Sequence, residues 1–377
     1  MIERYQVAIC QAERVAFRAG GPAKYKENKE GNLKRYCDLI DEACTGVFAG
    51  KSGFSGFGGG RVKLITFGEF ALTGHHLAAK AGDQLFNKSE IIEHLAVKIP
   101  GEETDVLAEK SRQHGVYIAA VNFEVDPEWP DFYFNTGFII SPEGKIILKY
   151  RKTLTNNPME VSCTAHDIMK AYKNPITKKY DPFPVIDTSI GRLAIMICAD
   201  LGSTEIPRVY ALKGAEVLLY LTSGNSHSAG GPRHPLGVLE AVMQANAFQN
   251  SIYFVNSNWG PELGARYPRA RIAGSSKVYD FIGNLLAKAE YADEMLVRAN
   301  IDIEALRQYR QQYYVNRLAL IRSELYAPYY SKTIYPPNTF LDDGPIEQVL
   351  DENQLKFFKQ AGENLQQCQD FYRETDI

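Results

Sequence analysis

Three side chains with complementary chemistry each stand at the end of an apolar run typical of a buried β-strand. They are the carboxylate of Glu69, the ammonium of Lys152 and the thiol of Cys198. A thiolate is a strong nucleophile, a carboxylate can accept and return its proton, and an ammonium can stabilise a negatively charged oxygen. Together these groups could attack a carbonyl carbon.

Cys198 is the most informative of the three. It ends the apolar run Leu193–Ile197 and opens the turn Ala199–Gly202, which leads into a helical stretch at 205–214 and a further strand at 217–221. A strand, a sharp turn and a helix present one side chain at a sheet edge, where N–H groups at a helix start favour an anion. A lone cysteine is more often an inert apolar residue, so this interpretation depends on the other two side chains.

Neither of the other two side chains is specific by itself. Glu69 alone would more often cap a helix or pair with a cation, and the adjacent cations Arg151 and Lys152 would usually be solvated surface charges. Successive residues of a strand point to opposite faces, so at most one of these two cations can serve a given site.

Short apolar runs alternate with amphipathic stretches along most of the chain, and hairpin turns are expected at Ser141–Gly144 and Phe281–Asn284. This alternation predicts an α/β sandwich with mixed sheets. The expected strands are 7–10, 62–67, 116–121, 138–140, 146–150, 193–197, 217–221 and 252–255, and the expected helices are 34–45, 104–114, 205–214 and 237–250.

Two segments look like additions to this pattern, so we divide the chain into a domain at 1–305 and a tail at 306–377. The glycine-rich stretch 46–60 is interpreted as a mobile surface insertion, because a phosphate loop would need a glycine where Thr45 stands. The tail is expected to be helical, then extended and rich in tyrosine, with a last helix at 345–373. It packs either on its own core or on a partner subunit.

Composition excludes several partners and cofactors. The net charge of −3 gives no reason to expect nucleic acid or an anionic membrane, and no apolar run approaches the roughly 20 residues of a membrane helix. We see no signal peptide. The six cysteines are scattered without CxxC pairs, as expected for reduced thiols in the cytoplasm. Without HxH or HExxH pairs, no metal site is predicted.

The order Glu69, Lys152, Cys198, with the neighbours of each residue, resembles the nitrilase or carbon–nitrogen hydrolase superfamily over about residues 5–305. Departures are present as well: Gly68 and Thr204 stand where the family usually has proline, and Ala199 replaces the aspartate common in aliphatic amidases. The nitrile-hydrolysing branch typically has Trp-Glu after its cysteine, whereas this chain has Ala199-Asp200. Further matching residues are Glu205, Arg208, Lys213–Glu216, Ala245–Asn250 and Gly274–Val278.

The resemblance implies a four-layer α-β-β-α sandwich that works without a cofactor and forms a homodimer or larger oligomer, with the tail taking part. It implies a Glu69–Lys152–Cys198 triad in which the backbone N–H of Ala199 helps to hold an oxyanion. Glu160, eight residues after Lys152, looks like the second glutamate of the aliphatic amidase and formamidase branch, which positions substrate and lysine. An ordinary loop glutamate remains an equal alternative.

These features predict a cytoplasmic amidohydrolase that cleaves a small non-peptide C–N bond through a thioester and releases ammonia or an amine. A primary aliphatic amide is the leading substrate, an N-carbamoyl compound comes second, and a nitrilase remains an alternative. An acyltransferase and a non-catalytic scaffold are less favoured. Glu205 and Arg208 are expected to form a structural or interface pair. Pocket walls are expected from loops at 122–136 and 222–233 and from the insertion, with Trp129, Phe134, Asn225 and His227 as candidates.

Overall fold

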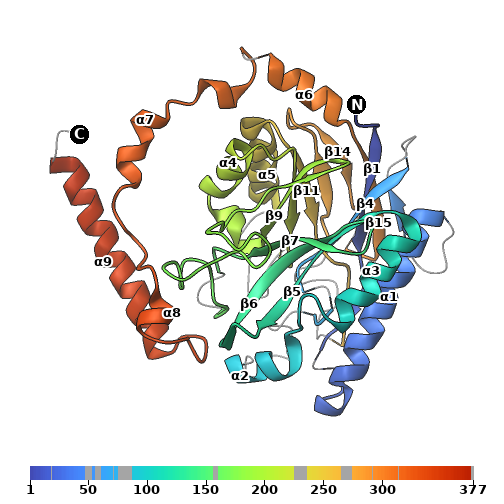
Figure 1. The fold of residues 1–377 in the computed structure, drawn as a ribbon, viewed down its shortest axis with the longest axis horizontal. Coiled ribbons are helices and arrows are strands. Elements are labelled where there is room, and N and C mark those ends of the chain that lie inside the picture. The colour runs from blue at the N-terminus through green and yellow to red at the C-terminus, as the bar shows by residue number, and fades with distance from the viewer. Residues whose placement is uncertain are drawn as a thin grey trace.

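Two β-sheets lie face to face in the computed structural model, and helices cover the outer face of each sheet (Figure 1). The structure describes residues 1–17, 19–46, 53–55, 61–70, 72–74, 87–155, 160–224, 236–264, 274–290, 292–312 and 314–374.

The first sheet has seven strands in the described part of the chain, in the order β3-β15-β1-β4-β5-β6-β7. Strand β4 is parallel to both β1 and β5, whereas β5, β6 and β7 form an antiparallel meander. The strands are β1 (Tyr5–Gln11), β3 (Gly53–Ser55), β4 (Val62–Phe67), β5 (Tyr117–Asp126), β6 (Trp129–Ile140), β7 (Ile146–Arg151) and β15 (Met295–Ile301).

The second sheet has the order β14-β13-β11-β10-β9-β8, and its three central strands β9, β10 and β11 are parallel. A short parallel pair, β2 (Arg14–Val15) with β12 (Glu262–Leu263), lies apart from both sheets. The strands of the second sheet are β8 (Ile186–Thr188), β9 (Gly191–Ile197), β10 (Val217–Leu221), β11 (Tyr253–Ser257), β13 (Lys277–Tyr279) and β14 (Leu285–Lys288).

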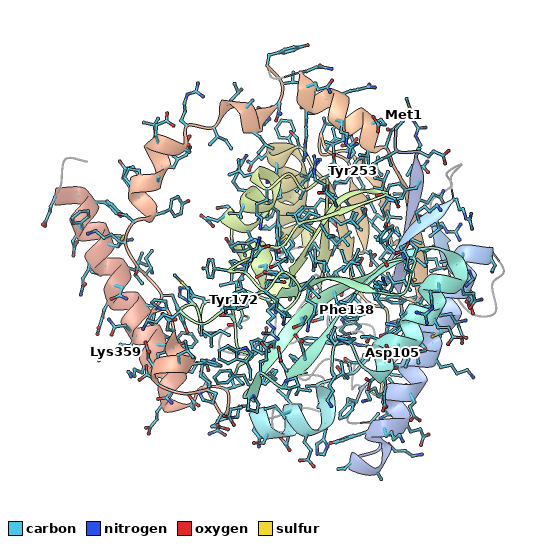
Figure 2. All side chains as sticks on the ribbon, in the orientation of Figure 1. Met1, Asp105, Phe138, Tyr172, Tyr253 and Lys359 are labelled. Atoms are coloured by element: carbon cyan, nitrogen blue, oxygen red, sulfur yellow. The ribbon has the colours of Figure 1, made fainter. Side chains whose placement is uncertain are left out.

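Alternating side chains of the first sheet lie in two different hydrophobic cores. On β1, Val7 and Ile9 face the core between the sheets, whereas Ala8 and Cys10 face the core under the helices α1 (Tyr25–Thr45) and α3 (Glu102–His114). This follows from the two-residue period of a strand. In Figure 2, Phe138 of β6 lies inside the body and Asp105 lies on α3.

The helices α4 (Glu205–Leu212) and α5 (Leu236–Asn250) cover the second sheet, so the predicted four-layer α-β-β-α sandwich is confirmed. The predicted strands and both hairpin turns are present, although α1 begins nine residues before its predicted start at Lys34. The shorter helices are α2 (Lys88–Glu90), a π-turn at Ile91–Leu95, and 3₁₀ turns at Pro22–Lys24 and Cys198–Gly202.

One loop prediction was wrong. Residues 122–136 form a hairpin of β5 and β6 rather than a loop. Its polar residues Asn122 and Glu124 resemble loop residues in the sequence, but both are buried, and Thr136 donates a hydrogen bond to Glu124. Within the predicted insertion, residues 53–55 form β3, which pairs with β15 at the sheet edge. Residues 47–52 and 56–60 lie outside the described residues.

The C-terminal extension arcs away from the sandwich and returns along its side (Figure 1). Helix α6 crosses the predicted boundary at 305, and the last helix begins at Glu352 rather than at Pro345. Each helix of the described residues is too short or too polar to span a bilayer. The helices are α6 (Ile303–Gln311), α7 (Ser323–Tyr326), α8 (Thr339–Asp342) and α9 (Glu352–Glu374), with 3₁₀ turns at Arg317–Leu320 and Ala327–Tyr330.

The sheets lie close together at Gly137 of β6, and this predicts how a substitution there would change stability. A Cβ at this position would lie 2.7 Å from the Cγ2 atom of Ile195 on β9, so Gly137→Ala should lower the free energy of unfolding by about 1–3 kcal/mol. Gly362 in α9 has no neighbour within 4 Å of such a Cβ. Gly362→Ala should therefore be neutral or stabilising. Equal urea denaturation curves for the two variants would contradict this account.

Candidate active site

The three predicted catalytic side chains follow the carboxyl ends of strands in two facing sheets. Glu69 lies two residues after β4, Lys152 directly after β7, and Cys198 directly after β9. The Lys152 ammonium donates a hydrogen bond to Glu69 Oε1 at 2.9 Å, and both side chains are about 1% exposed. The charges of both also act on the Cys198 thiol, so the structure brings the three groups together.

The Lys152 ammonium is held between two carboxylates. It donates to Glu69 Oε1 and, at 2.6 Å, to Glu160 Oε2. Burial by itself would lower the pKa of Lys152, but the negative charges of Glu160 and Glu69 raise it well above its usual value. An ammonium has three N–H bonds, so one remains after the two carboxylate bonds that are seen among the described residues.

Glu160 is a buried member of this cluster rather than a solvated loop residue. Asn135 of β6 links the two carboxylates, because its Nδ2 donates to Glu69 Oε1 and to Glu160 Oε1, each at 2.8 Å. Ser162 Oγ donates to Glu160 Oε1 at 2.8 Å. The backbone of Lys152 is fixed as well, since its N–H donates to the Asn135 carbonyl at 2.9 Å.

Cys198 sits at a strained elbow. Its φ of 42° lies in the left-handed region that non-glycine residues rarely adopt, and it opens the 3₁₀ turn that contains Ala199. Burial and the Glu69 charge raise the pKa of the Cys198 thiol to about 12, against the lowering effects of Lys152, Thr222 and the Ser223 backbone. At neutral pH the thiol is therefore protonated and needs a base before it can attack.

Asp200, two residues after Cys198, connects the elbow to the segment that carries Lys152. Its buried carboxylate accepts hydrogen bonds from Ile197 N at 2.8 Å, Leu154 N at 3.0 Å and the Tyr150 hydroxyl at 2.7 Å. Burial raises the pKa of Asp200 to about 6, although these hydrogen bonds oppose the shift. One side chain thereby fixes the distance between the ends of β7 and β9.

A second tight turn positions Glu69. Phe70 has a φ of 58°, and the buried Arg14 donates to the carbonyls of Glu69 and Phe70 at 3.1 and 3.0 Å. The Glu69 N–H donates to the Thr222 carbonyl at 3.1 Å, and Ser223 Oγ donates to Glu69 Oε2 at 2.7 Å.

Gly68, where the family usually has proline, is required by this packing. A Cβ at Gly68 would lie 2.9 Å from the Thr222 carbonyl oxygen and 3.0 Å from the Asn258 carbonyl carbon. Both contacts are to backbone, which cannot give way as a flexible side chain can. The departure from the family pattern therefore has a local steric cause.

Several expectations about neighbouring residues need correction. Phe134 does not line the site, because it precedes Asn135 on β6 and faces the other side, where the Arg151 guanidinium stacks 3.6 Å over its ring. Arg151 itself pairs with Glu124 and Asp126, as expected of a cation facing away from Lys152. Trp129 stacks on Phe132 near the hairpin tip, with ring centroids 5.5 Å apart. The candidates Asn225 and His227 lie outside the described residues.

Glu205 and Arg208 have separate partners. Glu205 accepts a hydrogen bond from the Tyr330 hydroxyl at 2.9 Å, and Arg208 donates to the Gln249 carbonyl at 3.1 Å. Glu205 thus links α4 to the C-terminal extension, and Arg208 links α4 to α5.

Sequence reasoning missed four residues that hold the site: Arg14, Asn135, Asp200 and Ser223. Ser223 had a usable signal, because it follows the predicted strand 217–221 and the carboxyl ends of parallel strands meet at one edge of a sheet. Asn135 is a lone amide in the run Phe132–Phe138. Arg14 had no such signal, because it acts through backbone carbonyls of a distant segment.

Comparison with known proteins places most of the chain in one family. The family model described as "Carbon-nitrogen hydrolase" matches residues 6–311. The human protein named Omega-amidase NIT2 is 29% identical over 232 residues, which cover 62% of this chain and 77% of that protein. Omega-amidase NIT2-B of Xenopus laevis is 27% identical over 222 residues, which cover 59% of this chain and 74% of that protein.

Solved structures share the fold. A carbon-nitrogen hydrolase from Helicobacter pylori G27 superposes with a TM-score of 0.62 at 18% identity, covering 87% of this chain and 99% of that one. A mutant of the amidase from Nesterenkonia sp. AN1 superposes with a TM-score of 0.56 at 17% identity, covering 87% and 98%. That structure is described as showing covalent addition of the acetamide moiety of fluoroacetamide at the active site cysteine.

The charges around Cys198 predict that two variants will shift the pKa of its thiol in opposite directions. Glu69→Gln removes a negative charge that raises the pKa of the thiol, so it should move that pKa downward, whereas Lys152→Met should move it upward. Each shift should be roughly 1 unit or more. The measurement is the pH dependence of iodoacetamide alkylation of Cys198, followed by mass spectrometry. Glu143→Gln, in an exposed turn, serves as control. Shifts of the same sign in both site variants would contradict the charge arrangement.

Proposed function

Because the chain belongs to the carbon–nitrogen hydrolase family, we propose that it hydrolyses a small aliphatic primary amide through a thioester on Cys198. The observation that carries this proposal is the buried Lys152 ammonium, hydrogen-bonded to Glu69 and Glu160 beside the thiol. The three groups supply a nucleophile, a base for its proton and a positive charge for the oxyanion.

Acylation begins with the protonated thiol. Glu69 takes the proton of Cys198 as Sγ attacks the carbonyl carbon, and the carbonyl oxygen becomes a tetrahedral oxyanion. The remaining N–H of Lys152 and the backbone N–H of Ala199 hold this oxygen; one such donor is typically worth about 3–4 kcal/mol of barrier. Glu69 then gives its proton to the nitrogen, the C–N bond breaks, ammonia leaves and a thioester remains.

Deacylation repeats the same steps with water as nucleophile. Glu69 takes a proton from water as the oxygen attacks the thioester carbonyl, and the same donors hold the second oxyanion. When the C–S bond breaks, the sulfur recovers the proton from Glu69 and the carboxylic acid is released. Glu69 thus acts as base and acid twice per turnover, whereas Lys152 stays charged throughout.

The choice of a primary amide rests on Glu160 and on the relatives. Glu160 Oε1 already accepts from Asn135 and Ser162, so its carboxylate is fixed where it can orient Lys152 and accept from a substrate N–H₂. The named relatives are omega-amidases, which favours an amide over a nitrile. The same proposal assigns the chain to the aliphatic amidase and formamidase branch, with Glu160 as the second glutamate of that branch.

We also propose that the protein is a cytoplasmic homodimer or larger homo-oligomer. All six cysteines are free thiols, which fits a reducing compartment. Large apolar side chains are exposed on α4 and on the extension beside it, including Leu212 at 60% and Tyr330 at 67%. Tyr330 is hydrogen-bonded to Glu205 of α4, so the two exposed surfaces adjoin.

Ammonia release from a substrate panel tests the reaction. Formamide and short aliphatic amides should release ammonia, N-carbamoyl compounds and nitriles should not, and Cys198→Ala should abolish the release. Glu160→Gln should lower kcat by about 10²-fold or more by loosening Lys152, because positioning losses of this size follow from misplacement by about 1 Å. Glu143→Gln serves again as the control. Release from nitriles alone, or full activity in Cys198→Ala, would refute the proposal.

Light scattering coupled to size exclusion tests the oligomer. The wild type should elute with at least twice the mass of one chain, and Leu212→Glu should shift it toward the monomer, because a buried unpaired carboxylate opposes association. Leu365→Glu, on an exposed position of α9, is the matched control. A wild-type monomer at micromolar concentration would contradict the assembly.

A further inference from the structure

Among the contacts of the C-terminal extension with the sandwich, one is made by a short run of consecutive buried residues. Within its described residues 314–374, Asn338–Phe340 is the one run of three consecutive buried residues. The three side chains are 4%, 2% and 5% exposed, although most neighbouring side chains of the extension face solvent. Asn338 has a φ of 62°, in the left-handed region. We call Asn338–Phe340 the anchor.

The anchor is seated on residues 160–172, the segment that begins with Glu160. The N–H of Asn338 donates to the His166 carbonyl at 2.9 Å, and Asn338 Oδ1 accepts from the Lys170 N–H at 2.7 Å. Figure 2 labels Tyr172, the last residue of this segment, on the side of the body that faces the extension. Hydrogen bonds from both the backbone and the side chain of Asn338 therefore fix one residue of the extension on this segment.

Asp167 joins the anchor to the rest of the segment. Its Oδ1 accepts from Thr339 Oγ1 at 2.7 Å, and its carbonyl accepts from the Phe340 N–H at 3.1 Å. Its Oδ2 accepts from the N–H and the hydroxyl of Thr164, at 2.9 and 2.7 Å. Asp167 is buried, so a lost partner would leave one of its carboxylate oxygens short of a hydrogen bond away from water.

The same segment then reaches Glu160. The Cys163 N–H donates to the Tyr133 carbonyl of β6 at 2.8 Å, and Ser162 Oγ donates to Glu160 Oε1. Thr339 is therefore connected to the carboxylate that holds Lys152 by hydrogen bonds through Asp167 to Thr164, by the backbone from Thr164 to Ser162, and by the Ser162 hydrogen bond to Glu160.

Phe340 supports the other partner of Glu160. Its ring lies 5.7 Å from that of Phe132, centroid to centroid, and it shares a buried apolar cluster with Phe132, Tyr133 and Cys163. Phe132 is on β6, three residues before Asn135, whose side chain donates to Glu160. Both elements that bond to Glu160 thus pack against the anchor.

We propose that the anchor is a positioning element of the active site: it holds segment 160–172 so that Glu160 keeps its hydrogen bond to Lys152. This inference rests on the proposed function for its effect on turnover. The extension is then needed for catalysis although none of the anchor residues touches substrate. Loosening the anchor allows Glu160 and the Lys152 ammonium to move out of position, and this weakens oxyanion binding in the transition state.

The test uses full-length Phe340→Ala and Thr339→Val, with Leu341→Ala as the neighbouring exposed control, since Leu341 is 38% exposed. Hydrogen–deuterium exchange should rise in peptides covering 160–172 for both anchor variants and stay unchanged for Leu341→Ala. The kcat for the amide should fall about tenfold with a smaller change in KM. Thr339→Ser, which keeps the hydroxyl, should restore both readouts and so excludes a general folding defect.

A double-mutant cycle decides whether the anchor acts through Glu160. In a Glu160→Gln background, Phe340→Ala should lower kcat by less than twofold, because the contact it supports is already lost. An equal tenfold loss in both backgrounds, or unchanged exchange in 160–172, would overturn the proposal. A wild type inactive on every amide would refute the proposed function instead, and the exchange measurement, which needs no substrate, would still decide whether the anchor holds the segment.

Discussion

The site depends on one interaction, the hydrogen bonding of a buried ammonium to two carboxylates. A lysine with about 1% exposure would lose its charge if it stood alone, because removal from water costs several kcal/mol per ion. Glu69 and Glu160 offset this cost and keep Lys152 protonated. Removing either carboxylate would also leave Asn135, which donates to both, with an unmatched donor. The four side chains are therefore one unit.

The rest of the fold keeps this unit in place. The parallel strands β4 and β5, and β9 and β10, bring their carboxyl ends to one region, where strained residues direct the side chains: Phe70 beside Glu69 and Cys198 itself. Strain of this kind costs about 1–3 kcal/mol per residue and persists only where the surroundings enforce it. Arg14 at one turn and Asp200 at the other supply that enforcement through hydrogen bonds to backbone.

Sequence patterns predicted the features that depend on residues close together in the chain. Apolar runs located the strands, and their ends located Glu69, Lys152 and Cys198. The same reasoning failed at residues 122–136, because the polar residues of a buried strand look like loop residues until their partners across the sheet are known. Asn135 and Arg14 depend on register and on contacts over tens of residues, which no local pattern encodes. Phe134 is an example. It lies one residue before Asn135 on β6, so its side chain is on the face of the sheet opposite to the site.

Two carboxylates are needed because of the proton that moves in the proposed reaction. The thiol, with a pKa raised to about 12, gives its proton to Glu69 during attack, so Glu69 is neutral while the oxyanion exists. If Glu69 were the lone counter-ion, Lys152 would then be held by the transient oxyanion alone. Glu160 keeps its charge through this step, so the ammonium stays protonated and in place. The proton transfer therefore moves one negative charge from Glu69 toward sulfur and oxygen and creates none.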